Sequence, residues 1–391
     1  MTLTENNVAA AAREDGGTLV PAASRAERFA SYDVEAFEVP RGREENWRFT
    51  PMKRLRGLHE GPVATGEVKV DADVAPEVRV ETVGREDERL GKGGKPSDRI
   101  AAQAYSSFTA ATVVTVPKET RASKPSVIRI TGPGEGNLAY GHIQVRAEPF
   151  AEAAIVLDHV GSGTYADNVE FVIEDNARLT VVSVQDWADD AVHVSEQHLK
   201  LGRDAQLRHI VVTLGGDLVR VSPTATFAGP GGDVEMLGLY FADAGQHQEH
   251  RLFVDHAEPN CKSNVMYKGA LQGEGAHGVW IGDVLIRAAA EGTETYEVNR
   301  NLVLTTGARA DSVPNLEIET GEITGAGHAS ATGRFDDEQL FYLQSRGIDE
   351  QQARRLVVRG FFHEILAKID IPEVRERLQT AIEAELEAVN A

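Results

Sequence analysis

The residues best suited to chemistry lie between positions 247 and 328. His247, His250 and His256 are followed closely by Cys261, which is the only cysteine of the chain. Imidazole and thiolate both bind zinc, so a metal site is one interpretation. The segment has no CxxC or HExxH spacing, however, and neighbouring side chains alternate faces in an extended strand, so only His250 and His256 could share one. We therefore favour histidines that are hydrogen-bonded within or between layers of a β-structure.

His328 stands apart in the glycine-rich segment GAGHAS, which we interpret as a turn. Its small neighbours leave the imidazole accessible, and a neutral imidazole is a good iron ligand. A solvated loop histidine is the alternative that the residues leave open. An iron–sulfur cluster takes about four thiolate or imidazole ligands, so a chain with one cysteine can supply only part of such a site. No Walker, GxSxG, SxxK or kinase motif accompanies it, and GKGGKP at 91–96 lacks the spacing of a phosphate loop.

A repeat of short strands surrounds these residues. From about Thr112, runs of Val, Ile and Leu are separated by the segments FAEA (150–153), DNARL (175–179), RDAQL (203–207), GGDV (231–234) and TGARA (306–310). Leu179 precedes Leu207 by 28 residues, Val234 follows after 27 more, and TGARA comes about three such periods later. A period of this size is typical of a solenoid. We predict a mainly β fold, a right-handed parallel β-helix over residues 111–333, in preference to a large β-sandwich.

Helical regions flank this predicted core. Residues 1–110 are expected to form an N-terminal helical or mixed region with a flexible start, in which Trp47 and Phe49 are packing anchors and residues 84–98 a solvated linker. Residues 334–391 are expected to form a C-terminal helical domain. Asp349 and Gln352 fit a capping box there, and Pro372 fits the first turn of a last helix. We expect this domain to cap the end of the solenoid.

The composition restricts the function. A formal net charge of −21 argues against binding to nucleic acid or to an anionic membrane surface. No apolar segment approaches the roughly 20 residues of a membrane span, and the N-terminus does not resemble a signal peptide. A single cysteine forms no intrachain disulfide, which fits a reducing compartment. We therefore expect a soluble, cytoplasmic protein.

Three segments, HRLFVDHAEPNCKSNVMYKGAL, TETYEVNRNLVLTTGARADSVPNLEIE and GAGHASATGRFDDEQLFYLQSRGI, resemble the core of the SufB/SufD family of iron–sulfur cluster assembly scaffolds. The resemblance runs from about Val113 to Ile365. It favours the SufD branch, because the chain is short for SufB and its cysteine lies well before the interface region. The resemblance implies a non-catalytic subunit of a SufBCD complex that pairs with SufB through the β-helices and docks the ABC-type ATPase SufC on its C-terminal helices. It also implies a cluster held transiently at the interface with SufB, and a reduced flavin as an optional cofactor.

The same resemblance assigns residues. His328 corresponds to a family histidine that faces SufB and helps to hold a nascent cluster with a partner cysteine. Many relatives carry a further cysteine where this chain has Ala326, so the site here would depend on His328 and the partner. The expected SufC-docking residues are Leu340, Phe341, Tyr342, Arg346, Arg359, Phe361 and Phe362, although at least half of these aromatic residues should pack the domain itself. An exposed sheet edge would also allow a homodimer when SufB is missing.

A second class of function uses the same fold. Parallel β-helices include polysaccharide lyases and hydrolases, which place carboxylates on one solenoid face. Asp158, Asp167, Asp175 and Asp255 could be imagined in that role. Aromatic residues make up only 6% of the chain, too few to favour a sugar-binding cleft, so we disfavour this class.

Overall fold

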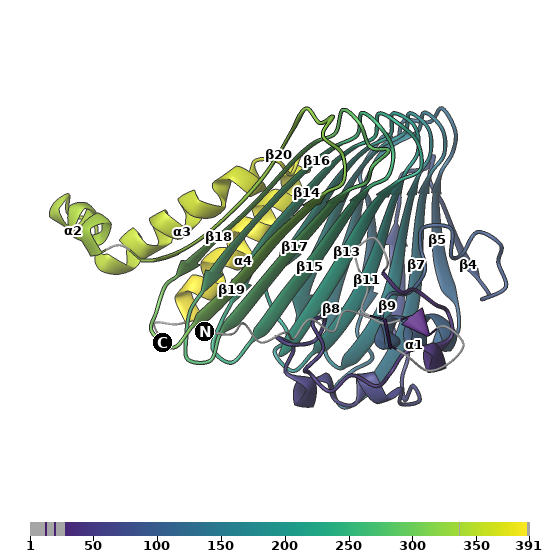
Figure 1. The fold of residues 1–391 in the computed structure, drawn as a ribbon. Helices are drawn as coiled ribbons and strands as arrows, with labels where there is room; N and C mark the ends of the chain where they lie inside the picture. The colour runs from purple at the N-terminus through teal and green to yellow at the C-terminus, as the bar shows by residue number, and fades with distance from the viewer. Residues whose placement is uncertain (1–11, 14–18, 21–27, 336, 389–391) are drawn as a thin grey trace.

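The body of the protein is a parallel β-solenoid built from two nine-stranded sheets (Figure 1). This topology confirms the predicted β-helix, and the β-sandwich alternative is wrong. The structure, a computed structural model, describes residues 12–13, 19–20, 28–335 and 337–388. Most of the flexible start expected before residue 26 lies outside these residues.

We name each sheet after its last strand. The β20 sheet comprises β3 (Lys69–Asp73), β6 (Ser126–Thr131), β8 (Glu152–Gly161), β10 (Arg178–Trp187), β12 (Gln206–Thr213), β14 (Asp233–Ala242), β16 (Lys262–Leu271), β18 (Glu294–Val303) and β20 (Gly325–Arg334). The β19 sheet comprises β4 (Arg79–Val83), β5 (Ala111–Val116), β7 (Leu138–Ala147), β9 (Thr164–Ile173), β11 (Val192–Leu201), β13 (Leu218–Phe227), β15 (His247–His256), β17 (His277–Ile286) and β19 (Arg309–Ile318). A separate pair, β1 (Ala12–Arg13) and β2 (Leu19–Val20), belongs to neither sheet.

The repeat period found in the sequence equals the spacing between residues that pair on neighbouring coils. Leu179 on β10 pairs with Leu207 on β12, and Leu207 pairs with Val234 on β14. These three side chains are buried in the core between the sheets. TGARA belongs to a different position, because it leads into β19 rather than into a strand of the β20 sheet. It therefore marks the opposite turn of the coil.

Most turns that lead into the β20 sheet carry a residue in the left-handed backbone conformation. These include Asn176 (φ 59°), Asp204 (φ 53°) and Asn260 (φ 58°), and this conformation is one that Asn, Asp and Gly tolerate best. The backbone N–H of each donates to a carbonyl of the following coil, at 2.8, 3.0 and 2.8 Å respectively. The backbone ladder therefore continues around the turn, which explains the recurring Asn, Asp and Gly signals.

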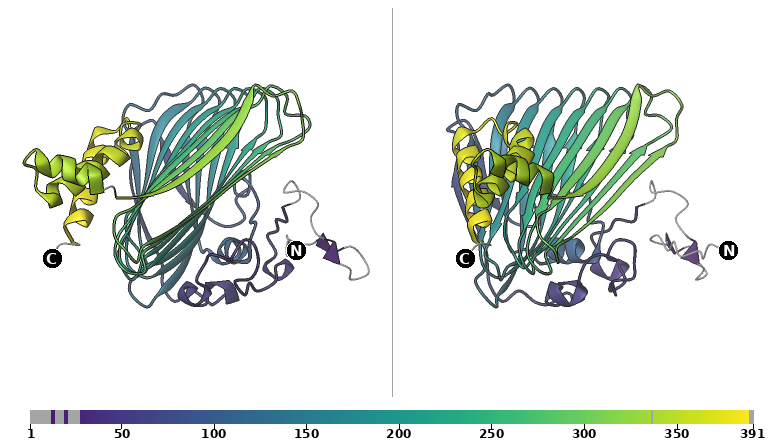
Figure 2. Two further views of the ribbon diagram at one scale, coloured as in Figure 1. Left: turned by 60° about the vertical axis from the view of Figure 1, so that its left-hand side comes forward. Right: turned by 90° about the vertical axis from the view of Figure 1, so that its left-hand side faces the viewer.

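Two helices, α3 (Glu350–Leu366) and α4 (Pro372–Ala388), cover the outer face of the β20 sheet (Figure 2). Val182, Ile210 and Leu237 point outward from their strands and pack in one cluster with Phe362 and Leu378 of the helices. These strands are buried on both faces, so they read as nearly continuous apolar runs. The C-terminal helical domain was expected to cap the end of the solenoid, and this prediction is wrong. The domain lies along the side of the solenoid, against the outer face of the β20 sheet.

The N-terminal region covers the outer face of the β19 sheet. It contains the short helices η2 (Val34–Ala36), η3 (Met52–Leu55) and η4 (Leu58–Glu60) and the helix α1 (Arg99–Ser107). Trp47 is buried as predicted, with the guanidinium of Arg220 3.9 Å from its ring centroid. The segment 84–98 is not a solvated linker, because the N–H groups of Gly91 and Gly93 donate to the carboxylate of Glu170, each at 2.6 Å.

The two ends of the solenoid differ. At the first coil, β3 and β4 run antiparallel to β6 and β5 and terminate the sheets with short, charged strands. At the last coil, β20 and β19 have neighbours on one side only. None of the helices in the described residues is long and apolar enough to cross a membrane.

Phe362→Ala tests how firmly the helices are held on the β20 sheet. Phe362 is 0% exposed, and emptying its position should lower the free energy of unfolding of the full chain by about 3–5 kcal/mol. Phe341→Ala is the matched control, because Phe341 is 73% exposed and its removal should change stability by less than about 0.5 kcal/mol. Equal effects of the two variants in denaturant unfolding would contradict this packing.

Candidate functional site: the open end of the solenoid

The last coil presents two unpaired strand edges side by side. Strand β20 is hydrogen-bonded only to β18, and β19 only to β17, within the described sheets. Most side chains of β20 are exposed and those of β19 are half-buried, whereas β16 and β17 are almost fully buried. Pro314 lies in β19, and proline belongs on edge strands because it donates no backbone hydrogen bond. This end can accept further strands.

The interior of the solenoid becomes polar as it approaches this end. On β18 the inward residues include Thr295 and Asn299, at coil positions that hold Val234 on β14 and Val211 on β12. Asn301 continues a row that is already polar in earlier coils, where Thr213 and Gln185 occupy its position. Asn301 donates through Nδ2 to Oδ1 of Asn299 at 2.8 Å, to Oγ of Ser312 at 2.9 Å and to Oγ1 of Thr332 at 3.3 Å. Amides and hydroxyls therefore close the last coils, so the end can face water without exposing an apolar core.

His328 lies within strand β20 and not in a turn as the glycine-rich segment suggested. Ala326, two residues earlier, packs against the interior core, and Thr332, four residues later, bonds to interior Asn301. Alternation along the strand therefore points His328 toward the inside of the coil. It is nevertheless exposed, because no further coil follows. Among the described residues we find no hydrogen bond or ion pair to its imidazole, so both ring nitrogens are available.

Glu297 is a residue of this end that the sequence did not single out. It pairs in register with His328 across β18 and β20, and it is 2% exposed. A Cβ atom added to Gly282 on β17 would lie 2.8 Å from its Oε1, so the carboxylate reaches across the interior toward the β19 sheet. Only the coil register places this carboxylate directly below His328, and a single sequence carries no signal for it.

The seven predicted docking residues divide into exposed and buried groups. Helix α2 (Asp337–Ser345), which projects from the body in Figure 1, exposes Phe341 (73%) and Tyr342 (57%). The guanidinium of Arg346, which is also exposed, lies 5.2 Å from the ring centroid of Tyr342. On α3, Arg359 is exposed, with one guanidinium nitrogen 3.7 Å from a Glu383 oxygen.

The remaining three residues of that set serve packing. Leu340 is 8% exposed and Phe362 0% exposed, so neither is free to meet a partner. Phe361 is half-buried beside Lys268, whose ammonium group lies 5.2 Å from its ring centroid. The surface available for docking is therefore carried mainly by α2.

The candidate zinc residues do not come together. His247 faces outward, where its Nδ1 lies 3.2 Å from Nδ1 of His277, whereas His250 and His256 face the interior and contact Thr213 and Ser263. Cys261 is buried, its Sγ 3.6 Å from two backbone carbonyls, and burial raises the pKa of its thiol. The histidines are thus bonded within and between coils, as predicted.

The carboxylates considered for a carbohydrate enzyme are also scattered. Asp158 is buried on the outer side and paired with Arg377, Asp167 is in the interior, Asp175 accepts from a turn N–H, and Asp255 pairs with Arg287. They occupy different faces, so the expected row of carboxylates on one face does not form.

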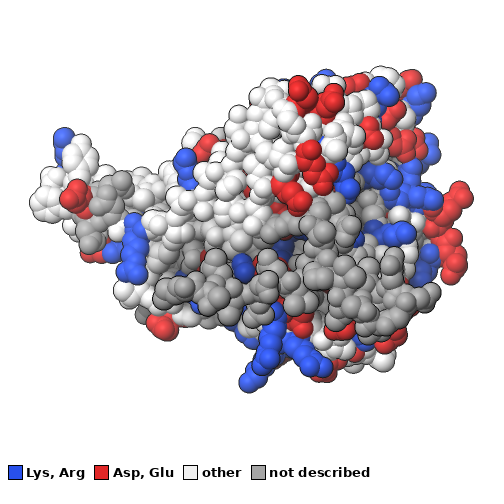
Figure 3. Space-filling view, viewed as in Figure 1, with Lys and Arg blue, Asp and Glu red and all other residues white. Residues whose placement is uncertain are grey.

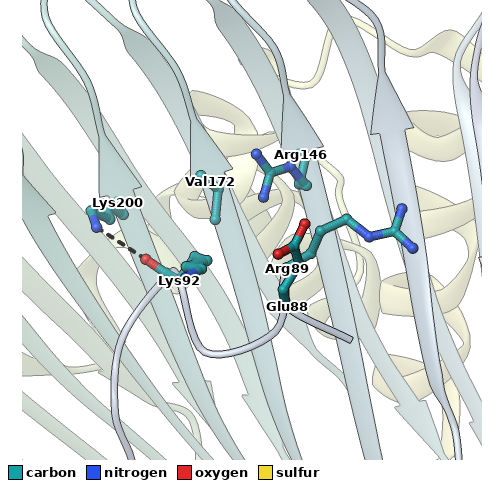
Figure 4. A pocket seen from close by; sticks show the side chains of 6 residues that line it. All are labelled: Glu88, Arg89, Lys92, Arg146, Val172 and Lys200. Carbon is teal, nitrogen blue, oxygen red and sulfur yellow. Dashed lines mark hydrogen bonds between the residues drawn. The ribbon is translucent and has the colours of Figure 1, made fainter. Parts of the chain in front are cut away.

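A hollow on the outer side of the β19 sheet, about 390 Å³ in volume, is rich in cations (Figure 4). Its lining includes Arg89, Arg146 and Lys200. Arg89 is paired with Asp87 and Arg146 with Glu174, and Lys200 donates to the carbonyl of Lys92. With these charges already engaged, the hollow does not compete with the open end as a site.

The charged side chains of the last coil lie on β19 and on the turn that follows it, at Arg309, Asp311, Glu317, Glu319 and Glu322. Within β20 the only Lys, Arg, Asp or Glu is Arg334, at its final position, and broad parts of the surface in Figure 3 carry no charged side chain. An edge strand poor in charge, with an accessible imidazole, is suited to contact with another protein.

Comparison with known proteins gives a consistent result. Residues 128–361 match the family model described as SUF system FeS cluster assembly, SufBD core domain. An iron-sulfur cluster assembly SufBD family protein of Mycobacterium tuberculosis is 66% identical over 371 residues, which cover 93% of this chain and 94% of the relative. One from Mycobacterium leprae is 64% identical over 377 residues, covering 95% and 96%. A second SufBD family protein of Mycobacterium tuberculosis is 27% identical over 219 residues, covering 56% of this chain and 26% of that protein.

Proposed function

Because this chain belongs to the SufBD family of the SUF system for iron–sulfur cluster assembly, we propose that it is the SufD-like scaffold subunit of a SufBCD complex. In this role it assembles and transfers clusters in the cytoplasm with its partners and has no catalytic residues of its own. The open end of the solenoid carries the proposal, because its unpaired strands and its accessible histidine suit a shared site.

The proposed partner at this end is a SufB-type member of the same family. Mycobacterium tuberculosis has two SufBD family proteins, one closely and one distantly similar to this chain, which is the pattern expected of two paired subunits. Pairing through β19 and β20 would satisfy the free backbone groups of both edges. Two copies of this chain could pair in the same way when the SufB-type protein is missing.

The proposed cluster site combines His328 with a cysteine of the SufB-type partner. This chain cannot supply thiolates there, because its single cysteine, Cys261, is buried in a turn distant in sequence from β20. His328 offers a ring nitrogen from the last strand, at the surface where the partner would pack. The cluster is thus a transient cargo of the interface, and we assign no residue of this chain to a flavin.

The ATPase SufC is proposed to dock on helix α2. Phe341 and Tyr342 are among the most exposed large apolar side chains of the described chain, and Arg346 lies beside them. Exposed aromatic residues next to an arginine are typical of residues that dominate binding energy. Leu340, Phe361 and Phe362 would support this surface from below, and Arg359 would border it.

The test is affinity purification of the tagged full chain, co-expressed with its SufB-type paralogue and the SufC-type ATPase. We expect all three proteins to co-elute. Combined Phe341→Ala and Tyr342→Ala should reduce the recovered ATPase at least about tenfold and leave the SufB-type protein bound. Phe150→Ala is the matched control, since Phe150 is 57% exposed but lies in a solenoid turn.

Point variants are preferable to removal of the C-terminal domain. Deleting residues from 336 onward would uncover the apolar outer face of the β20 sheet, including Val182, Ile210 and Leu237, and would invite aggregation. Elution of the tagged chain without either protein would contradict the proposed function. Normal ATPase recovery with the double variant would contradict the docking surface alone.

A further inference from the structure

Three buried side chains meet inside the solenoid, far along the chain from the open end. His159 projects inward from β8 of the β20 sheet, and Asp167 and His193 project inward from β9 and β11 of the opposite sheet. Their ligand atoms all lie within 4.8 Å of one another, and the three residues are 0%, 1% and 0% exposed. Two imidazoles and a carboxylate in an interior lined mostly by Val, Leu and Ile require an explanation.

The hydrogen bonds around Gln185 define the state of His193. The indole N–H of Trp187 can only donate, and it lies 2.8 Å from the Gln185 side-chain atom assigned as Oε1, which confirms that this atom is the oxygen. The same oxygen lies 2.8 Å from Nδ1 of His193. The indole nitrogen also lies 3.2 Å from this Nδ1, but the shorter contact of Nδ1 is with an oxygen that only accepts, so Nδ1 carries a proton. In the neutral form of the ring, Nε2 is then the nitrogen that keeps a lone pair.

His159 has the same arrangement. Its Nδ1 lies 3.1 Å from the carbonyl oxygen of Val184, which again can only accept. The Gln185 amide nitrogen, a donor, is 3.2 Å from the same Nδ1, but it has Oγ of Ser183 as an acceptor at 3.1 Å, so the Val184 carbonyl decides the tautomer. In the neutral ring the lone pair then lies on Nε2, which has no hydrogen-bond partner among the described residues.

The Asp167 carboxylate lies beside the hydroxyls of Ser195 and Tyr165, but acceptors of the three side chains also face one another. Nε2 of His193 lies 3.3 Å from Oδ1 of Asp167, and in the neutral tautomer with the proton on Nδ1 neither atom has a proton to share. Nε2 of His159 and Oδ2 of Asp167 have no hydrogen-bond partner among the described residues. Leaving a buried acceptor without a partner in this way destabilises the folded chain. A cation at the centre would satisfy all of them together.

We propose that His159, Asp167 and His193 bind one divalent transition-metal ion through the two Nε2 atoms and the Asp167 carboxylate. This ligand set suits Zn²⁺ or Fe²⁺, whereas Mg²⁺ and Ca²⁺ prefer oxygen ligands. Both imidazoles already donate their other N–H to a carbonyl oxygen, which is the usual support of a metal-bound histidine. Ligands about 2.0–2.2 Å from zinc lie roughly 3–3.5 Å apart. His193 Nε2 and Asp167 Oδ1, at 3.3 Å, already meet this spacing, and the widest separation, up to 4.8 Å, must close by about 1.3–1.8 Å.

The ion would join the two sheets where apolar packing between them is interrupted. It links β8 directly to β9 and β11, the strands of consecutive coils. This site is separate from His328 and does not depend on the proposed cluster-assembly role. Its expected effect is on the stability of the chain, because an ion bound only by the folded state raises the free energy of unfolding.

The experiment uses the full chain, stripped with a chelator and then incubated with Zn²⁺ alone or, without oxygen, with Fe²⁺ alone. Elemental analysis of the desalted protein should find about one ion per chain, and the ion should raise Tm. Asp167→Asn should lower the bound metal at least about tenfold and remove the rise in Tm. His209→Gln is the matched control, because His209 is another fully buried interior histidine outside this cluster, and it should bind metal as the wild type does.

Equal metal content in Asp167→Asn and the wild type would overturn the proposal, as would a wild-type chain that retains no ion. Loss of metal in His277→Gln but not in Asp167→Asn would move the ion to the outer His247–His277 pair and would also overturn it. If Asp167→Asn does not fold, Co²⁺ in the wild type provides the test. Visible bands of a nitrogen-ligated, low-coordinate ion that disappear in His193→Gln support the site, and the spectrum of the hydrated ion refutes it.

Discussion

His328→Ala is expected to lower the iron and acid-labile sulfide of the purified complex at least about tenfold, without dissociating it. The imidazole is exposed on the last strand and turned toward the inside of the coil, and it has no partner among the described residues. In the proposed site, its removal would therefore take away an iron ligand and little else. The free energy of unfolding should change by less than about 0.5 kcal/mol.

Ser330→Ala is the control for this variant. Ser330 follows His328 on the same inward face of β20 and is also exposed, so it reports on any general disturbance of the strand. Its complex should contain as much iron and sulfide as the wild type. Unchanged iron in His328→Ala would refute the cluster role, and loss of the SufB-type protein from that variant would make His328 an interface residue instead.

Acidification is expected to destabilise the chain steeply below pH 6.5. Burial lowers the pKa of His209, His250 and His256 to about 3, with Glu249 and His247 acting in opposite directions on His250. The unfolded chain, in which a histidine has a pKa of about 6.5, binds these protons and the folded chain does not. The free energy of unfolding is therefore fully retained above pH 6.5 and falls as the pH decreases from 6.5 toward 3.

The expected size of this effect is large. Each histidine contributes up to about 1.4 kcal/mol per pH unit, so the three together remove about 5 kcal/mol between pH 6.5 and pH 5. Whole domains are stable by only about 5–15 kcal/mol. Urea unfolding at a series of pH values measures the slope directly.

His209→Leu isolates one of these protons. Neither ring nitrogen of His209 has a hydrogen-bond partner among the described residues, so leucine breaks no bond there. The variant should gain about 2 kcal/mol relative to the wild type when the pH is lowered from 8 to 5. The same acid dependence in His209→Leu and wild type would show that His209 is not a source of the effect.

The coil repeat could be predicted from the sequence because it is a local pattern. The left-handed turn residues Asn176 and Asp204 recur with the strand spacing, and Leu179, Leu207 and Val234 mark one position on successive coils. TGARA was assigned to the wrong turn because both turns of a coil use the same small and polar residues. The pattern gives the period but not the side of the coil.

Features that depend on the stacking of coils could not be predicted. The C-terminal helices were correctly expected, but an apolar helix face does not say which surface it covers, and here it is the outward Val and Ile side chains of the β20 sheet. GAGHAS was interpreted as a turn because its residues are small. They form a strand because β18 supplies a hydrogen-bonding edge at the right distance.

The buried group of His159, Asp167 and His193 also depends on the stacking of coils and could not be predicted from the sequence. His159, Asp167 and His193 occupy three strands of two sheets, and nothing in their spacing resembles a metal motif. Asp167 was considered only as one of several scattered carboxylates. The triad emerges when the register aligns β9 with β11 and the turn folds β8 against them.

The difference between the two ends of the solenoid also determines how many chains can associate. One end is terminated by the antiparallel strands β3 and β4, and the other leaves β19 and β20 free to pair. If two solenoids join through their free ends, the two outer ends of the pair are formed by the short, charged, antiparallel strands β3 and β4. In the proposed pairing, growth would therefore stop at a pair and would not continue into a filament, because short, charged edge strands accept further strands poorly. The length and charge of β3 and β4 would then limit the stoichiometry of the scaffold.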